Sequence, residues 1–212
     1  MFITLEGIEG SGKTTQIQRI ARFLTRLGYE TVVTREPGDT LVGRRIRSIL
    51  LDPESKGMSS LCELLLYGAD RAQHLDDVVR PALDGGKVVL CDRFADATRA
   101  YQGFARGMDM GLIEKIHEIV VQGLRPDLTL LFDLDPRTGL DRTFKALENG
   151  QRDGSESRFE LEKINFHQRV RAGYLELAAK EKDRFWVVDA SCDPDRVFEQ
   201  IIEGIQTRLA IP

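Results

Sequence analysis

The residues best able to do chemistry lie near the amino terminus, in a glycine-rich stretch that follows an apolar segment. Residues 7–14 read Gly-Ile-Glu-Gly-Ser-Gly-Lys-Thr, which has the Gly-x-x-x-x-Gly-Lys-Ser/Thr spacing of a phosphate-binding loop. Glycines let several backbone N–H groups converge on one anion, and Lys13 adds a point charge. A helix that opens there would hold the Thr14 hydroxyl toward Mg²⁺ at its positive end. We therefore predict a nucleoside triphosphate site built from Gly7, Ile8, Glu9, Gly10, Ser11, Gly12, Lys13 and Thr14.

Two aspartates could serve the metal that such a loop needs. Asp92 and Asp133 each end an apolar run. A carboxylate there can hold Mg²⁺ directly or through water, although the same position also suits a helix cap. We predict Thr14 and Asp92 as the metal-site residues, with Asp133 as the competitor. Arg93 follows directly, and its guanidinium could bind a second phosphate group or form only a surface ion pair.

Two sets of side chains on predicted helices could bind a base. Tyr67 and Arg71 stand four residues apart, so a ring and a guanidinium would share one helical face. Thr98, Tyr101 and Gln102 repeat this geometry with a hydroxyl, a phenol and an amide. Either set could equally be a half-buried packing face, so their spacing alone leaves both interpretations open.

Strand and helix patterns alternate along the chain and would position these groups. Apolar or β-branched runs predict strands at 2–5, 31–34, 87–92, 127–134 and 184–189. Helical patterns lie between them, and Ser60–Glu63 has the sequence of a capping box that opens a long helix toward Arg80. This alternation predicts an α/β fold of the P-loop NTPase class, with a five-stranded parallel sheet flanked by helices on both faces.

One segment cannot belong to the core. Residues 148–157 contain no apolar side chain. We expect a mobile lid at about 142–158, which would close over the ligands and keep water from the transferred group. The whole chain, 212 residues of which 42% are hydrophobic, can bury one sizeable core, so we predict a single domain spanning 1–212.

Charge and cysteine content narrow the range of partners. The 30 basic and 34 acidic residues give a net charge of −4, which does not favour a nucleic-acid or membrane surface that works through bulk charge. Cys62, Cys91 and Cys192 are odd in number and far apart, which fits free thiols in a reducing compartment. The amino-terminal residues do not resemble a signal peptide, and no apolar run approaches the roughly 18 residues of a membrane span. We expect a cytoplasmic protein without nucleic-acid or membrane partners.

Five segments, taken in order, resemble the bacterial thymidylate kinase family. They are Ile8–Thr15, Thr34–Gly38, Asp92–Phe94, Ala100–Gly103 and Arg125–Thr129. The combination of Arg-Glu-Pro-Gly, Asp-Arg-Phe and Ala-Tyr-Gln-Gly is more selective than the phosphate-binding loop alone, and the match covers nearly the whole chain. The resemblance implies transfer of the γ-phosphoryl group from ATP to deoxythymidine monophosphate (dTMP), with Mg²⁺, by a homodimer.

The resemblance also implies roles on the acceptor side. Tyr67 would stack on thymine and Arg71 would bind its carbonyl edge. Thr98 and Gln102 would contact the other polar atoms of the base, and Tyr101 would lie where a ribose 2′-hydroxyl would clash. The implied acceptor-site residues are Glu9, Glu36, Pro37, Tyr67, Arg71, Arg93, Thr98, Tyr101 and Gln102.

Around the reacting groups, Glu9 would bind the 3′-hydroxyl near the metal, Arg93 would hold the acceptor phosphate, and Arg142 would lie against adenine. The lid departs from the usual family pattern, because its nearby cations are Lys145 and Arg152. The predicted catalytic residues are Lys13, Arg93, Arg142, Lys145 and Arg152. Two further departures are Asp39 in place of a second glycine and Ala97 in place of a common serine.

Other functions stay open on the residues alone. A nucleoside monophosphate is mostly dianionic at pH 7, with a second pKa of about 6, so its attack needs no general base and the three histidines can be structural. A kinase acting on the unphosphorylated nucleoside would need a carboxylate, for which Glu9 or Glu36 could serve. The chain could also be a nucleotide-binding switch without transfer activity. A guanine-specific GTPase is disfavoured, because no Asn-Lys-x-Asp element is present.

Overall fold

Five parallel strands form the centre of the molecule. The computed structural model describes residues 1–150, 154–209 and 211. The strands follow the order β2-β3-β1-β4-β5, and every neighbouring pair is parallel. The predicted α/β fold is therefore confirmed, and each strand begins and ends within one residue of its predicted bounds. The bounds are β1 (Phe2–Glu6), β2 (Thr31–Arg35), β3 (Val88–Asp92), β4 (Leu128–Asp133) and β5 (Phe185–Asp189).

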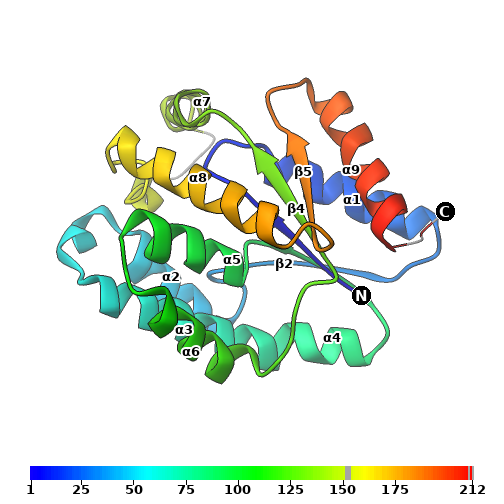
Figure 1. Cartoon of the computed structure of the whole chain (residues 1–212), viewed down its shortest axis with the longest axis horizontal. Helices are drawn as coiled ribbons and strands as arrows, with labels where there is room; N and C mark the ends of the chain where they lie inside the picture. Colours follow the sequence, from blue (N-terminus) through cyan, green and yellow to red (C-terminus); the bar gives the residue numbers. More distant parts are fainter. Residues whose placement is uncertain (151–153, 210, 212) are drawn as a thin grey trace.

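Helices cover both faces of the sheet, as predicted. In Figure 1, α1 (Lys13–Arg26) and α9 (Pro194–Leu209) lie side by side on one face, and most of the other helices lie toward the opposite face. None of the helices in the described ranges is both long and apolar enough to cross a lipid bilayer. The other helical segments are α2 (Leu41–Leu51), η1 (Pro53–Gly57), α3 (Ser60–His74), η2 (Leu75–Val79), α4 (Arg80–Asp84), α5 (Ala95–Thr98), η3 (Arg99–Ala105), α6 (Met110–Val121), α7 (Pro136–Glu148), η4 (Gly154–Glu156) and α8 (Ile164–Lys180).

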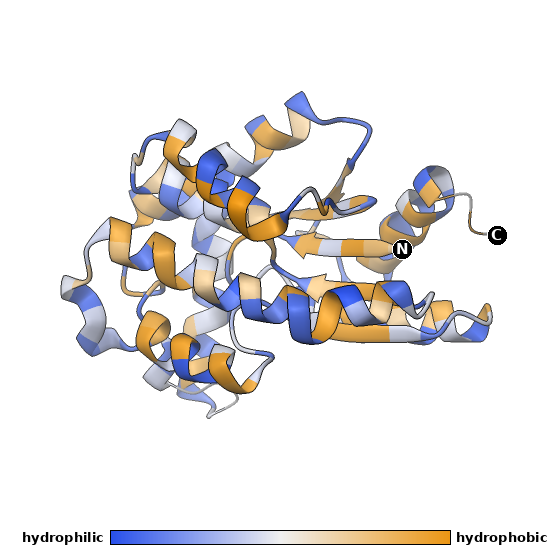
Figure 2. Cartoon of the chain, turned by 90° about the horizontal axis from the view of Figure 1, so that it is seen from below, coloured by the Kyte–Doolittle hydropathy of each residue, from blue (hydrophilic) through white to orange (hydrophobic). Residues whose placement is uncertain are grey.

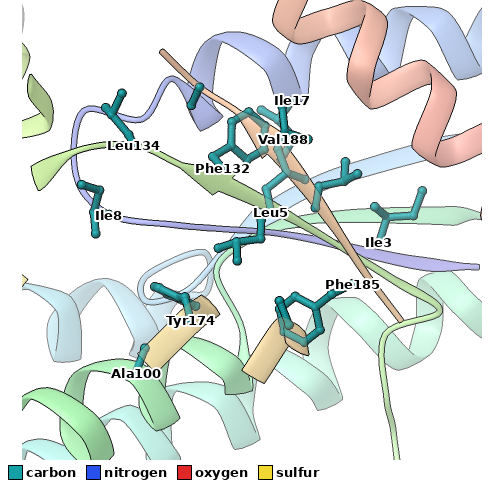
Figure 3. Packing of buried hydrophobic residues seen from close by; sticks show 14 of the residues in the cluster. Ile3, Leu5, Ile8, Ile17, Ala100, Phe132, Leu134, Tyr174, Phe185 and Val188 are labelled. Carbon is teal, nitrogen blue, oxygen red and sulfur yellow. The ribbon is translucent and has the colours of Figure 1, made fainter. Parts of the chain in front are cut away.

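The strands are apolar on both faces because both faces are covered. Within β3, Val88 and Leu90 belong to the main hydrophobic cluster, whereas Val89 and Cys91 belong to a second cluster with side chains from η2 and α4. Figure 2 shows the strands mostly in the hydrophobic colour, and in Figure 3 Ile17 lies on the opposite side of β1 from Tyr174. Each such aliphatic side chain contributes about 1.5–3 kcal/mol by leaving water.

The register of the strands brings the functional loops to one edge of the sheet. Leu5 of β1 pairs with Asp92 of β3, and Arg35 of β2 pairs with the same aspartate. The segments that follow β1, β2 and β3 therefore emerge side by side at the carboxyl edge, which is where open α/β sheets bind ligands.

The beginning of α3 differs from the prediction. Ser59 caps this helix, because its hydroxyl oxygen accepts a hydrogen bond from the Cys62 N–H at 3.3 Å. A cap one residue earlier than Ser60 leaves Glu63 beyond the third helical position, so the predicted capping box was wrong. Glu63 is buried instead. The helix continues through the π-helical η2 into α4, and Pro81 lies in the first turn of α4.

The predicted helix that carries Thr98, Tyr101 and Gln102 also differs from the regular α-helix that its pattern predicted. It consists of the short α5 and the π-helical η3. A π-helical turn is wider than an α-helical turn, so side chains separated by three or four residues do not share one face in the expected way. Thr98, Tyr101 and Gln102 accordingly contact three different partners, Arg71, Glu9 and Glu63.

The lid segment is only partly irregular. Its first residues, up to Glu148, belong to α7, and Gly154–Glu156 form η4. Residues 151–153, which include the predicted lid cation Arg152, lie outside the described residues. At the end of the segment Arg158 is buried, and its backbone N–H donates to the Leu51 carbonyl oxygen at 3.1 Å. This part is attached to α2.

Candidate active site

The glycine-rich loop folds closely around its own lysine. Gly10 has a φ of 69° and packs so tightly on α7 that an added Cβ would lie 2.1 Å from the carbonyl oxygen of Gly139. Lys13 begins α1, and its Nζ donates to the carbonyl oxygens of Gly7 and Ile8 at 3.0 and 2.9 Å. Only a glycine fits at position 10, because any side chain there would collide with α7. The hydrogen bonds from Lys13 to the loop carbonyls hold its ammonium group at the positive end of α1.

The surroundings of Lys13 lower its pKa. Burial, together with the positive charge of Arg93, lowers the pKa of Lys13 from 10.5 to about 8. The side chain is charged for the most part at pH 7, and an anion bound against it would restore the higher pKa. The loop thus has the electrostatic character of an anion site.

Asp92 is better placed than Asp133 to meet a cation. Its Oδ1 is buried without a hydrogen-bond partner among the described residues, and the side chain lines the same cleft as Thr14. Asp133 instead accepts two hydrogen bonds from Arg171 at 2.6 and 2.9 Å. The carboxylate and the hydroxyl are the oxygen donors that Mg²⁺ accepts when phosphates supply its other ligands.

Arg93 adopts a backbone conformation that is unusual for a residue with a side chain. Its φ is 70°, in the left-handed region that favours glycine. The guanidinium donates to Glu9 at 2.8 Å and to the Tyr101 hydroxyl at 3.0 Å, and that hydroxyl donates to Glu9 at 2.5 Å. Burial opposes ionisation of Glu9, but His167, which contacts it at 3.4 Å, and Arg93 lower its pKa well below the ordinary value. A carboxylate, a phenol and a guanidinium are therefore held together beside the loop.

A second buried cluster surrounds Arg71. The guanidinium donates to Glu36 at 2.7 Å, to the Phe94 carbonyl oxygen at 3.0 Å and to Thr98 Oγ1 at 3.1 Å. Glu36 also contacts His74 Nδ1 at 2.9 Å. Arg71 and Glu36 side chains are each 2% exposed, so this ion pair is fully desolvated and its geometry is fixed from several elements.

The amide of Gln102 belongs to a third group. Its Nε2 donates to Glu63 Oε1 at 2.7 Å, and Glu63 also contacts Arg106 and Arg158. Tyr67 follows Glu63 one turn later on α3 and faces the same cleft as Gln102. The predicted base-binding residues thus come together, although they are held by different neighbours.

One cleft of about 710 Å³ brings most of the predicted residues together. Gly7 and Ile8 do not line it, although their carbonyl oxygens accept hydrogen bonds from Lys13, and Lys145 is exposed on α7 away from its lining. Arg142 reaches it from α7 and donates to the carbonyl oxygens of Gly10 and Ala190 at 3.4 and 3.2 Å. The predicted residues in the lining are Glu9, Gly10, Ser11, Gly12, Lys13, Thr14, Glu36, Pro37, Tyr67, Arg71, Asp92, Arg93, Thr98, Tyr101, Gln102 and Arg142.

Sequence reasoning missed two arginines of this cleft. Arg35 ends β2 next to Glu36 and lines the cleft, and its place at the exit of a predicted strand was an available signal. Arg47 of α2 also lines it and is bonded to Glu156 of η4 at 2.8 and 2.7 Å. No local pattern relates Arg47 to Glu156, because they are far apart in the chain.

The loop after β2 requires only one glycine. Gly38 has a φ of 109°, and an added Cβ would lie 2.6 Å from Cδ of Arg47. Asp39 does not share the positive φ, and its carboxylate accepts a hydrogen bond from Thr34 at 2.5 Å. The departure at position 39 is therefore accommodated by a local hydrogen bond.

An anion-binding loop and a second crevice of buried polar groups share one cleft at the carboxyl edge of a parallel sheet. Such a pair of neighbouring sites can hold a phosphoryl donor and an acceptor in line. The fold and the site define a P-loop kinase. A family model described as thymidylate kinase matches residues 5–201. The chain belongs to the thymidylate kinase family.

Individual relatives agree with this assignment over nearly their full length. A thymidylate kinase of Desulforapulum autotrophicum is 64% identical over 211 residues, covering 100% of this chain and 93% of the relative. A thymidylate kinase of Desulfosudis oleivorans is 55% identical and covers 97% of this chain and 96% of the relative. A crystal structure of thymidylate kinase from Ehrlichia chaffeensis superposes with a TM-score of 0.78 at 33% identity, covering 97% of this chain and 98% of that one. The activity is that of the family, the phosphorylation of dTMP to dTDP by a kinase that binds ATP.

Proposed function

We propose that ATP binds at the glycine-rich loop and dTMP in the crevice between Arg71 and Tyr101, so that the γ-phosphoryl group passes directly between them. The observation that carries this proposal is the single cleft lined by both Lys13 and Arg71. Because the acceptor phosphate is already dianionic near neutral pH, the protein has to neutralise charge and align the two ligands rather than remove a proton.

On the donor side, Lys13 would exchange its contacts with loop carbonyls for the terminal phosphates. Arg142, which lies over the loop through its hydrogen bond to the Gly10 carbonyl oxygen, would contact adenine. The backbone N–H groups of the loop would bind the phosphate oxygens.

The metal site proposed here consists of Thr14 and Asp92. The unpartnered buried Oδ1 of Asp92 supports it. Mg²⁺, when bound, would neutralise charge on the phosphates. Thr14 would orient its hydroxyl from the first turn of α1, and Asp92 would coordinate the ion directly or accept hydrogen bonds from its water ligands.

On the acceptor side, Arg93 would hold the phosphate of dTMP. Its contact with Glu9 already fixes the guanidinium, and Glu9 would in addition accept a hydrogen bond from the 3′-hydroxyl. Tyr101 is buried against the same pair and would leave no room for a 2′-hydroxyl.

The base would lie among Tyr67, Arg71, Thr98 and Gln102, with Glu36 and Pro37 beside it. Arg71 is supported by Glu36 and Thr98, so its position is set before a base binds. The ring of Tyr67 would stack on thymine, and Arg71, Thr98 and Gln102 would bind its polar atoms.

Lys145 and Arg152 remain the proposed lid cations. Lys145 projects from the exposed side of the last turns of α7, so it would have to approach by movement of the segment that follows. We propose that this segment, at about 142–158, is a mobile lid within a single domain.

We also propose a homodimer formed by α2, α3 and α6. These helices lie together in Figure 1, and α3 contacts both neighbours. Each carries exposed large apolar side chains: Leu41, Val42 and Ile49 on α2, Leu61 and Leu65 on α3, and Leu112 and Ile119 on α6. Burial of such side chains stabilises a symmetric interface. Light scattering of the chain and of Leu65→Glu tests it, and a chain that is monomeric at high concentration would contradict the dimer.

The cytoplasm is the compartment that we propose. It supplies both ATP and dTMP, and Cys62, Cys91 and Cys192 are all free thiols.

The choice of acceptor is tested by one coupled assay of ADP formation with thymidine, dTMP and the other nucleoside monophosphates. Acceptor-dependent ADP release with dTMP, and not with thymidine, is expected. A preference for thymidine would favour a nucleoside kinase that uses Glu9 or Glu36 as a base, and ATP binding without acceptor-dependent release would favour a switch.

A further inference from the structure

Glu63 is a buried carboxylate for which the proposed transfer gives no role. It lies in α3, is 1% exposed and points into the space between α3, η3 and the end of the lid segment, where Arg158 lies. Its Oε1 accepts from Gln102 at 2.7 Å and from Arg106 at 3.3 Å, and its Oε2 accepts from Arg106 at 3.3 Å and pairs with Arg158 at 2.7 Å. Donors on three sides hold the carboxylate in one orientation.

The contact with Gln102 has a chemical consequence. An ionised carboxylate can only accept hydrogen bonds, so the amide must turn its Nε2 toward Glu63. Burial opposes ionisation of Glu63, but the Gln102 hydrogen bond and the charges of Arg106 and Arg158 lower its pKa below the ordinary value. The amide oxygen of Gln102 is then directed away from Glu63, and no residue in the described ranges donates a hydrogen bond to it.

We propose that Glu63 is a positioning residue that fixes the amide of Gln102 with its oxygen toward the base. An amide oxygen accepts a hydrogen bond, so it favours a pyrimidine that carries a hydrogen on N3 and disfavours one with a lone pair there. Thymine and uracil have that hydrogen, whereas cytosine does not. This inference rests on the proposed placement of the base beside Gln102.

The test compares three monophosphates in the Glu63→Gln variant. dTMP and 5-methyl-dCMP share the 5-methyl group but differ at N3 and at the neighbouring 4-position, whereas dUMP keeps the pairing edge of dTMP and lacks only the methyl group. A glutamine at position 63 has one acceptor oxygen for three donors and also an NH₂ group, so the Gln102 amide is free to turn over. We expect the ratio of kcat/KM for dTMP to that for 5-methyl-dCMP to fall about tenfold, which is the size of one hydrogen bond in discrimination. The ratio for dTMP to dUMP should stay unchanged.

Glu162→Gln is the matched control. Glu162 accepts from Arg106 Nη1 at 2.5 Å on the far side of the same cluster and does not contact Gln102. This variant removes one carboxylate charge from the cluster but leaves the Glu63–Gln102 hydrogen bond, so both ratios should match those of the unchanged chain. A role of Glu63 in packing alone would lower kcat/KM for all three substrates by one factor, and that result would overturn the proposal.

Two further variants keep the outcome decisive. If Glu63→Gln does not fold, the double variant Glu63→Gln with Arg106→Gln takes its place. It removes the Arg106 cation, which competes for the one acceptor oxygen of the glutamine at position 63. The same loss of discrimination between dTMP and 5-methyl-dCMP is expected. Gln102→Ala distinguishes a failure of the proposed base placement from a failure of the positioning role of Glu63. If that variant keeps the discrimination against 5-methyl-dCMP, the base does not lie beside Gln102 and the proposed placement fails. If it loses the discrimination while Glu63→Gln keeps it, only the positioning role fails.

Discussion

The two sides of the cleft are built in different ways. The proposed donor side consists of a continuous stretch, Gly7–Thr14, completed by Asp92 from the neighbouring strand. The acceptor side takes one or two side chains from each of several elements that are remote in the chain, and Glu36 and Arg71 there are desolvated and paired with each other. The donor side therefore depends on local backbone geometry, whereas the acceptor side depends on mutual compensation of buried charges.

This difference predicts different effects of substitutions on the two sides. A substitution of Lys13 or Ser11 on the proposed donor side should remove chemistry and leave the fold intact, because the hydrogen bonds of these side chains stay within the loop and do not join distant segments. A substitution on the acceptor side should reduce stability and selectivity together, because each charged group there neutralises another.

The largest effect is expected from Lys13→Ala. The variant would lose the positive charge that we propose the loop directs at the terminal phosphates, so we expect kcat to fall by at least about 10³-fold with little change in unfolding temperature. Steady-state ADP formation measures it. The control is Lys180→Ala, which removes an exposed lysine paired with Glu176. A kcat within tenfold of the unchanged chain would contradict the role of Lys13.

The next effect is expected for Glu36→Gln, measured as stability. This change leaves the Arg71 guanidinium buried without its counter-charge, so the free energy of unfolding should fall by about 3 kcal/mol. The matched control is Asp195→Asn, which breaks the ion pair between Asp195 and Arg19. The Asp195 side chain is 85% exposed, so this variant should lower the free energy of unfolding by no more than about 1 kcal/mol. Urea unfolding of both variants gives the comparison. Equal losses would show that burial of the acceptor-side pair has no energetic consequence.

A smaller effect concerns sugar selectivity. Tyr101→Ala should lower the preference for dTMP over ribothymidine monophosphate about tenfold, because the excluded volume at the 2′-position is lost. Tyr101→Phe keeps the ring against Phe159, at 5.5 Å between centroids, but removes the hydroxyl that donates to Glu9. The preference should survive in that variant. If both variants lose it, the hydrogen bonds rather than the ring determine selectivity.

The smallest effect is expected from Glu6, which ends β1 just before the loop. Burial and the nearby Asp96 raise its pKa from 4.5 to about 8, so the folded protein holds a proton that the unfolded chain releases above pH 4.5. Stability is then lost as the pH rises toward and through 8, by about 1 kcal/mol between pH 7 and pH 8. Glu6→Gln can still meet the Phe94 N–H and the Tyr174 hydroxyl without titrating. Thermal unfolding at both pH values should show a smaller decline in the variant, and parallel curves would contradict the raised pKa.

The features that sequence could predict are those encoded by neighbouring residues. The strands and the phosphate-binding loop follow from apolar runs and from glycine spacing within a dozen residues, and the structure confirms the sheet that they predict. The capping error at Ser60 arose because Ser59 and Ser60 are both acceptable caps, and the burial of Glu63 decided between them.

The remaining features depend on contacts between distant segments. The pairing of Arg71 with Glu36 joins α3 to the loop after β2, and that of Arg47 with Glu156 joins α2 to η4. The hydrogen bond from Gln102 to Glu63 depends on the π-helical geometry of η3, which a helical period of 3.6 residues does not reveal. Local propensity carries no information about these partners.

The wide turns of η3 also constrain how this chain can change in length. If one residue were deleted between Arg99 and Ala105, the segment could close ordinary α-helical turns, but the residues before and after the deletion would be rotated relative to each other by about 100°. Tyr101 and Gln102 could then no longer both reach Glu9 and Glu63. Deletions should therefore be better tolerated in the turn at 107–108, which follows this segment, than within it, even though an α-helix is the more regular structure.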